Sequence, residues 1–121
     1  MATDLSALSS LVRNNRVADL EAALDSPECC VNVNAEDAQG NTLLCVAAQN
    51  GNKRIIKLLL RRGAAINHCN LRGNSPLHFL YAFGYKELGV YLVGKGADDS
   101  IRNHDGLTPY EGTTGESLKA L

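Results

Sequence analysis

The sequence predicts an all-α repeat solenoid, a stack of helix–loop–helix units with β-turn fingers along one edge. Three blocks recur at an offset of 33 residues, beginning at Asp37, Asn70 and Asn103. Each block has glycine at its fourth place, a hydroxyl side chain at its sixth and a large apolar or aromatic residue at its eighth. The repeat also extends between the blocks, where Gly51 and Gly84 occupy equivalent positions. Self-similarity at such a period is the signature of a repeat array, and we expect residues 1–121 to form one such domain.

Residues 1–36 form the N-terminal cap unit of this array. Apolar residues recur at helical spacing from Leu5 to Val12 and again from Val17 to Leu24, which predicts two short helices. The segment lacks the turn signature of the other blocks and carries extra residues around 25–28. A terminal unit departs from the repeat because one of its faces meets water.

Residues 37–69 form the second unit. Gly40 supplies the positive φ of a tight turn, and Thr42 is well placed to cap a helix over about 43–50. An apolar i, i+4 stripe within 55–60 predicts the second helix of the pair. Glycines that suit the left-handed residue after a helix follow both segments, at Gly51 and Gly63.

Residues 70–102 form the third unit, and residues 103–121 a partial C-terminal cap unit. Ser75-Pro76 and Thr108-Pro109 predict helix starts, because proline at the first helical position loses no useful N–H. Gly89 lies inside the second helix of the third unit and should weaken it by about 1 kcal/mol relative to alanine. Residues 116–121 form a short capping helix, or the chain is a piece of a longer protein.

These residues resemble the ankyrin repeat, whose pattern reads D-x-x-G-x-T-P-L-H-x-A-A-x-x-G, then an apolar helix, then G-A-x-x-N. The second unit fits from Asp37 to Asn67, and the third supplies Ser75-Pro76-Leu77-His78. The resemblance covers most of the chain, and it implies stacked units with projecting fingers. It also places Asn67 at a position that is hydroxylated in some ankyrin repeats, although this asparagine commonly braces the loop between units.

Two departures from the ankyrin pattern predict local differences. Cys45 stands where the family has histidine, so the threonine–histidine hydrogen bond is lost in the second unit, whereas Ser75 and His78 can form it in the third. Leu80-Tyr81 replaces a pair of alanines that lets neighbouring helices approach. We expect local repacking around Tyr81 and an exposed Phe83.

The resemblance implies that the chain binds another protein, as a scaffold or adaptor, through a concave groove of finger tips and first helices. An extended or helical segment of the partner would dock there, with Phe83 and Arg72, flanked by Leu71, as anchors. The contact positions carried over from the family are Gln39, Asn41, Gln49, Asn50, Leu71, Arg72, Asn74, Ala82, Phe83, His104, Asp105 and Leu107.

Two alternatives stay open, one from the charge distribution and one from the incomplete last unit. Residues 41–72 carry six basic and no acidic residues, and Lys53, Lys57 and Arg61 share one helical face. The stripe from Lys53 to Arg62 could contact an anionic lipid or a nucleic acid, although a formal net charge of −1 disfavours a nucleic-acid partner. Alternatively, the chain is a cis-regulatory ankyrin domain of a longer enzyme or channel.

Catalytic, cofactor and metal motifs are missing from the sequence, so we expect no enzyme activity, no cofactor and no metal site. His68-Cys69 is the nearest approach to a ligand pair, but further ligands at matching spacing are absent. The four cysteines show no disulfide spacing, which favours reduced thiols. With neither a signal peptide nor a membrane span, we expect the protein in the cytoplasm, with the nucleus as a further location. We also expect a monomer.

Overall fold

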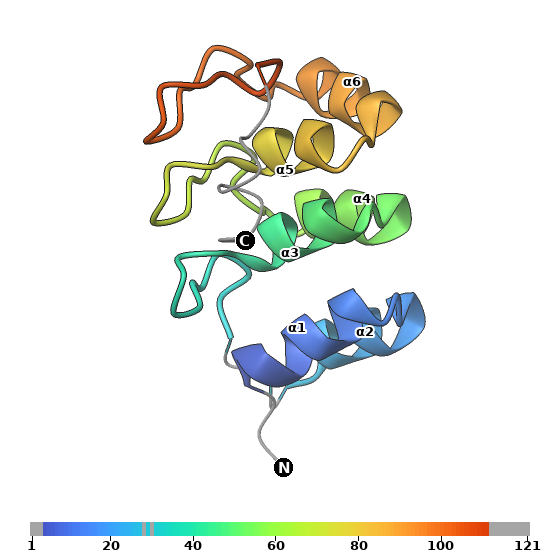
Figure 1. Ribbon diagram of the computed structural model, residues 1–121. Helices are drawn as coiled ribbons and strands as arrows, with labels where there is room; N and C mark the ends of the chain where they lie inside the picture. The colour runs from blue at the N-terminus through green and yellow to red at the C-terminus, as the bar shows by residue number, and fades with distance from the viewer. Residues whose placement is uncertain (1–3, 28, 30, 112–121) are drawn as a thin grey trace.

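The computed structural model describes residues 4–27, 29 and 31–111, and among these it contains six helices and no strand. The helices form pairs that stack in successive layers, and the loops between them project as fingers from one side (Figure 1). The predicted all-helical repeat stack is therefore confirmed. The helices are α1 (Leu5–Arg13), α2 (Val17–Asp25), α3 (Leu43–Asn50), α4 (Lys53–Arg61), α5 (Pro76–Ala82) and α6 (Lys86–Gly94).

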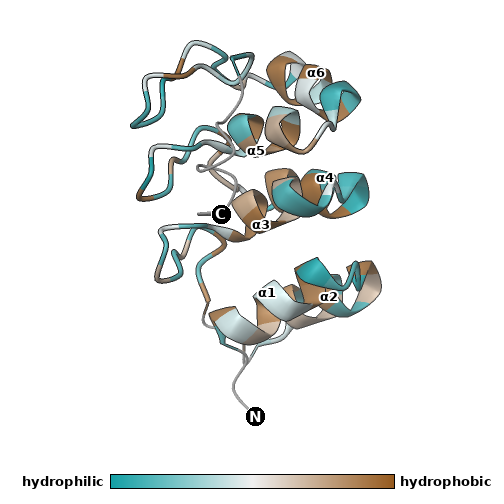
Figure 2. Cartoon of the chain, viewed as in Figure 1, coloured by the Kyte–Doolittle hydropathy of each residue, from teal (hydrophilic) through white to brown (hydrophobic). Residues whose placement is uncertain are grey.

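The core is a strip that runs through the stack and is centred on α3. This helix contacts α1 on one side, α5 on the other and its own partner α4. Every residue from Leu43 to Ala48 is therefore buried. Figure 2 shows the hydrophobic residues concentrated on the helices, while the fingers are mostly hydrophilic or neutral. The fingers therefore bury few apolar side chains.

The helix starts follow the capping residues that the sequence indicates. Asp4 accepts a hydrogen bond from the Ala7 N–H at 2.8 Å, which begins α1. Thr42 accepts from the Cys45 N–H at 3.4 Å, so α3 begins at Leu43 as predicted. Gly51 ends this helix with φ of 64°, the left-handed conformation expected of it.

His78 is a fully buried link between the third unit and the last finger. Its Nε2–H donates to the Leu107 carbonyl at 2.9 Å, which leaves Nδ1 free to accept from the Ser75 N–H at 3.1 Å. The predicted Ser75–His78 pair is therefore present, as a capping box. In the second unit, Thr42 Oγ1 donates instead to Cys45 Sγ at 3.5 Å.

This arrangement predicts that stability falls as pH drops below about 6.5. Burial lowers the pKa of His78 below its usual 6.5, although the Leu107 carbonyl opposes the shift. The unfolded chain then binds more protons than the folded one between the two pKa values, so stability is complete above 6.5 and declines as pH falls towards the folded pKa. Urea unfolding of wild type and His78→Gln from pH 7.5 to 5 measures this. The variant should lose a part of the pH dependence that the matched surface variant His104→Gln retains, and equal slopes would contradict the assignment.

Compared with the second unit, the third unit has a larger residue on its first helix and a smaller residue on its second helix. Tyr81 on α5 occupies the place of Ala48, and Gly89 on α6 occupies the place of Ile56. A β-carbon at residue 89 would lie 2.7 Å from Cε2 and Cζ of Tyr81, so the ring covers the buried glycine. Tyr81 is half-buried and Phe83 is 43% exposed, which confirms the repacking of the first and the exposure of the second.

The loops after the second helices are braced by asparagines from the preceding unit. Asn34 Oδ1 accepts from the Ala65 N–H at 2.7 Å, and Asn67 Oδ1 accepts from the Asp98 N–H at 2.8 Å. Asn67 therefore has the bracing role expected of it. The hydroxylation of Asn67 stays a prediction from the family resemblance.

The last unit departs from the expected helix start. Pro109 to Glu111 form a turn, in which the Glu111 N–H donates to the Thr108 carbonyl at 3.1 Å. Tyr110 packs on Tyr81 with ring centroids 5.0 Å apart, and its hydroxyl donates to Asp99 Oδ2 at 2.6 Å. That hydrogen bond raises the pKa of Tyr110 to about 12. The capping helix expected over 116–121 lies outside the described residues.

Candidate functional site

Each finger is a tight turn built by its first residue. In the three fingers this residue is Asp37, Asn70 or Asn103, and its Oδ1 accepts from the backbone N–H groups two and four positions later, at 2.9 to 3.0 Å. Its carbonyl accepts from the N–H of the glycine at the fourth position, also within 3.0 Å. The same three hydrogen bonds recur in each finger because an Asp or Asn side chain opens it.

Neighbouring fingers are joined through their backbones. The Leu71 N–H donates to the Gln39 carbonyl at 3.0 Å, and the His104 N–H donates to the Arg72 carbonyl at 2.9 Å. Gly73 permits this close approach for two reasons. Its φ of 77° is a conformation that other residues rarely adopt, and a β-carbon there would lie 2.8 Å from Cδ2 of His104. The spacing between finger tips is therefore set by the backbone.

A buried asparagine ladder repeats the connection beneath the tips. Asn70 Nδ2 donates to Asn41 Oδ1 at 3.0 Å, and Asn103 Nδ2 donates to Asn74 Oδ1 at 2.9 Å. Asp37 opens the first described finger and has no amide to donate. This role of Asn70 and Asn103 goes beyond the sequence-based predictions, although their recurrence at the 33-residue offset is a signal for it.

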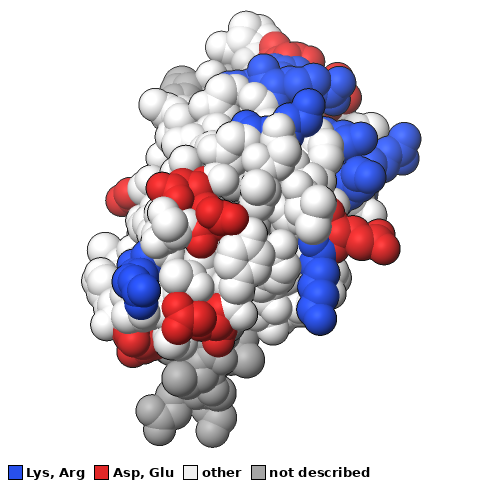
Figure 3. All heavy atoms as spheres, turned by 90° about the horizontal axis from the view of Figure 1, so that it is seen from above, with Lys and Arg blue, Asp and Glu red and all other residues white. Residues whose placement is uncertain are grey.

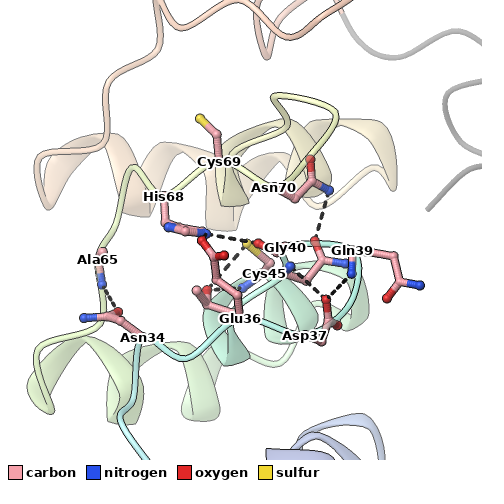
Figure 4. Close-up of polar contacts among 12 residues, drawn as sticks. Asn34, Glu36, Asp37, Gln39, Gly40, Cys45, Ala65, His68, Cys69 and Asn70 are labelled. Atoms are coloured by element: carbon pink, nitrogen blue, oxygen red, sulfur yellow. Dashed lines mark hydrogen bonds and ion pairs between the residues drawn. The ribbon is translucent and has the colours of Figure 1, made fainter.

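His68 holds the base of the first finger from the following loop. Its Nε2 lies 3.0 Å from the Gly40 carbonyl and 2.9 Å from Glu36 Oε1, as Figure 4 shows. These two contacts give His68 a structural role. Among the described residues, no group of three or more His, Cys, Asp or Glu side chains could hold a metal ion.

A hollow of about 560 Å³ lies between the finger tips. Leu71 projects at its rim with 66% of its surface exposed, beside the exposed Arg72. The adjoining hollow, of about 390 Å³, shares Gln39 and continues to α1. The lining of the first hollow is Ala38, Gln39, Asn41, Asn70, Leu71, Arg72 and His104. The finger side thus offers a continuous surface that combines one apolar anchor with polar and cationic groups.

The structure divides the predicted contact residues into three groups. Asn41 and Asn74 are only 7% and 1% exposed and serve the ladder, so they position the fingers and have little surface to offer a partner. The ends of α3 and α5 carry a second group that does not line the hollow: Gln49, Asn50, Ala82 and Phe83. The remainder lie on the fingers: Gln39, Leu71, Arg72, His104, Asp105 and Leu107.

The repeated finger, paired helices and loop brace identify the architecture, and the family comparison agrees. The family model described as ankyrin repeats (3 copies) matches residues 5–103. The chain belongs to the ankyrin repeat family. Ankyrin repeats are generally protein–protein interaction modules, and the chain's ankyrin fold is the one that the sequence predicted.

Among curated ankyrin relatives, the BRCA1-associated RING domain protein 1 of Caenorhabditis elegans is 35% identical over 105 residues, which span 86% of this chain and 14% of that protein. The ADP-ribosylation factor GTPase-activating protein AGD2 of Arabidopsis thaliana is 37% identical over 90 residues, 70% of this chain and 12% of that protein. The Notch-regulated ankyrin repeat-containing protein of Xenopus laevis is 34% identical over 85 residues, 69% of this chain and 75% of that protein. The chain therefore spans about one seventh or less of the first two relatives.

Other features of the ankyrin chain bear on its chemistry. Cys29, Cys45 and Cys69 are free thiols, and burial raises the pKa of Cys45 above its usual 9.0. Cys30 lies outside the described residues. In the described part of the chain, no helix is both long and apolar enough to cross a membrane.

Proposed function

We propose that this chain is a scaffold or adaptor module that binds a segment of a partner protein across its finger tips. The observation that carries the proposal is the hollow between the tips, where the exposed Leu71 adjoins Arg72 and His104. Arginine and large apolar side chains near the centre of a patch tend to supply most of the binding energy. The relatives named as regulators, including protein phosphatase 1 regulatory subunit 27 of Homo sapiens, support the same class of function.

Rigid docking is the mechanism that the finger geometry supports. Backbone hydrogen bonds and the asparagine ladder hold the three tips in a fixed spacing before any partner arrives. A preformed surface loses little conformational freedom on binding, so more of the contact energy appears as affinity. An extended segment suits this surface, because the tips form a row with a polar surround and one apolar anchor.

The double variant Leu71→Ala/Arg72→Ala tests this proposal. Both side chains are exposed, so the variant should fold normally, while affinity for a partner captured from cell lysate should fall by about 30-fold or more. The partner is identified by mass spectrometry and its Kd is measured by calorimetry with purified proteins. Phe83→Ala is measured separately, because Phe83 does not line the hollow.

A matched control keeps the interpretation specific. Lys53→Ala/Lys57→Ala changes two exposed residues on α4, away from the fingers, and should leave this Kd within about twofold. Circular dichroism confirms that all variants are folded. If the finger variant retains the same set of proteins with the same affinity as wild type, the proposal is wrong.

A second candidate function is a cis-regulatory ankyrin domain within a longer protein. The observation that favours it is that the matched segments are 14% and 12% of the first two relatives. Sequencing the transcript downstream of the codon for Leu121 tests this candidate. An open reading frame that continues into an enzyme or channel domain supports it, and a stop codon at that point, with no domain encoded upstream, removes it. Monomeric state and a cytoplasmic or nuclear location remain predictions from the sequence.

A further inference from the structure

The basic stripe of α4 converges with α6 around one aromatic ring. The ammonium groups of Lys53, Lys57 and Lys95 lie 5.7, 5.4 and 5.6 Å from the centroid of the Tyr91 ring. An aromatic face attracts each cation by about 0.5–1 kcal/mol at an exposed site, but three like charges around one ring also repel one another. The three ammonium groups therefore concentrate positive charge around the Tyr91 ring, and the fold does not compensate this charge within the described residues.

Acidic side chains do not neutralise this cluster within the described residues. Arg62, at the end of the same stripe, pairs with Asp25 of the first unit at 2.5 Å. No such ion pair is formed by Lys53, Lys57, Arg61 or Lys95 in the part of the chain that the structure describes. Figure 3 shows Lys and Arg atoms gathered along the upper and right side of the surface, where some acidic atoms lie beside them, while other acidic atoms lie on the left.

The cluster borders a hollow with an apolar floor. This hollow has a volume of about 490 Å³ and is open to solvent. Leu60, Ala64 and Ile66 lie in it together with the Tyr91 ring, and cationic groups stand at its margin. In Figure 1, α4 and α6 lie one above the other on the side away from the fingers, so this surface is distinct from the finger tips. We call the set Lys53, Lys57, Arg61, Tyr91 and Lys95, with this floor, the Tyr91 patch.

We propose that the Tyr91 patch is a second binding site, which takes an acidic peptide segment carrying one apolar side chain. The carboxylates would pair with the lysines around the ring, and the apolar side chain would enter the hollow against Leu60 and Ile66. Charge complementarity is the reason for an acidic occupant, since an anion relieves the repulsion among the three ammonium groups. The inference is independent of the function proposed for the fingers.

A peptide fits the patch better than a lipid surface or a nucleic acid. The hollow is concave and of the size that receives side chains, whereas a bilayer offers a broad face. A sugar–phosphate chain would leave the apolar floor unused.

The experiment uses three probes against the full chain. The first is a fluorescent nine-residue peptide of aspartate and glutamate with a central leucine, and a version with serine in place of leucine tests the apolar floor. The others are phosphatidylcholine vesicles with 30% phosphatidylserine and a single-stranded oligonucleotide. Binding is measured by fluorescence anisotropy and vesicle sedimentation at about 50 and 150 mM salt, because charge pairs at a surface weaken with salt.

The test variant is Lys53→Gln/Lys57→Gln/Lys95→Gln. Its matched control, Arg13→Gln/Arg16→Gln/Lys86→Gln, removes the same charge from exposed positions elsewhere. We expect wild type and control to bind the leucine peptide alike, and the test variant to bind at least about tenfold more weakly. The serine peptide should bind more weakly than the leucine peptide to wild type.

Three results would overturn the proposal. One is that wild type does not bind the peptide at either salt concentration. Another is that the test variant and the control bind it equally, so that only net charge matters. The third is that vesicles or the oligonucleotide bind more tightly than the peptide and depend on the same lysines, which would make the patch a lipid or nucleic-acid site.

Discussion

Gly89→Ile should destabilise the protein by about 2–3 kcal/mol, while the double variant with Tyr81→Ala should recover most of that loss. The reason is the exchange of volume in the third unit, where Tyr81 covers Gly89 and a β-carbon at residue 89 would meet the ring at 2.7 Å. Tyr81→Ala alone should cost about 2 kcal/mol, because it removes a half-buried ring. The double variant restores the alanine–isoleucine pair of the second unit.

The measurement is a double-mutant cycle by urea unfolding. We expect the cost of the double variant to be smaller than the sum of the single costs by about 3 kcal/mol. Gly94→Ala serves as the control, because a β-carbon at Gly94 has no atom within 4 Å, and it should be neutral or stabilise α6 by up to about 1 kcal/mol. Additive costs in the cycle would show that the two residues do not compensate each other.

Asn70→Ala should have an effect of similar size through the asparagine ladder. Its side chain donates to Asn41 Oδ1 and accepts from the N–H groups of Arg72 and Asn74, each at 3.0 Å. Asn70 is 8% exposed, so its loss leaves buried polar groups without partners. We expect a loss of about 2–4 kcal/mol in the free energy of unfolding.

The control for this prediction is Asn50→Ala. Asn50 is an exposed asparagine whose side chain donates to the Val46 carbonyl of its own helix, so the change should cost less than about 1 kcal/mol. Amide hydrogen exchange gives the second readout. In Asn70→Ala the N–H groups of Arg72 and Asn74 should exchange faster than in wild type, and equal exchange with equal stability would refute the ladder's role.

Much of the fold could be predicted from the sequence, because its determinants are local and periodic. Thr42 caps α3 and Gly51 ends it, and each decision depends on residues within one helical turn. The compensation of Tyr81 by Gly89 could not be foreseen, since it requires knowing which residue of α6 faces α5. The glycine taken as a weak point in a helix proves to be the space that the tyrosine fills.

The candidate site was harder to predict because exposure depends on how neighbouring fingers meet. Leu71 and Arg72 lie where the repeat register placed them, whereas Asn41 and Asn74 are covered by the next finger and used in its support. Lys95 could not be assigned to the basic stripe from sequence, because it comes from the following unit. It joins the stripe at the Tyr91 ring and in the hollow that Lys57 and Arg61 also line.

The most direct test of the finger surface is the ¹H–¹⁵N spectrum of this 13.0 kDa chain with and without the partner captured by wild type. We predict that the largest shift changes fall on the finger tips, at residues 38–39, 71–72 and 104–105, with smaller changes in α4 and α6. Changes concentrated in 53–61 and 91–95 would place that partner on the Tyr91 patch instead. That result would contradict the proposal that the finger tips are where this ankyrin chain binds its partner.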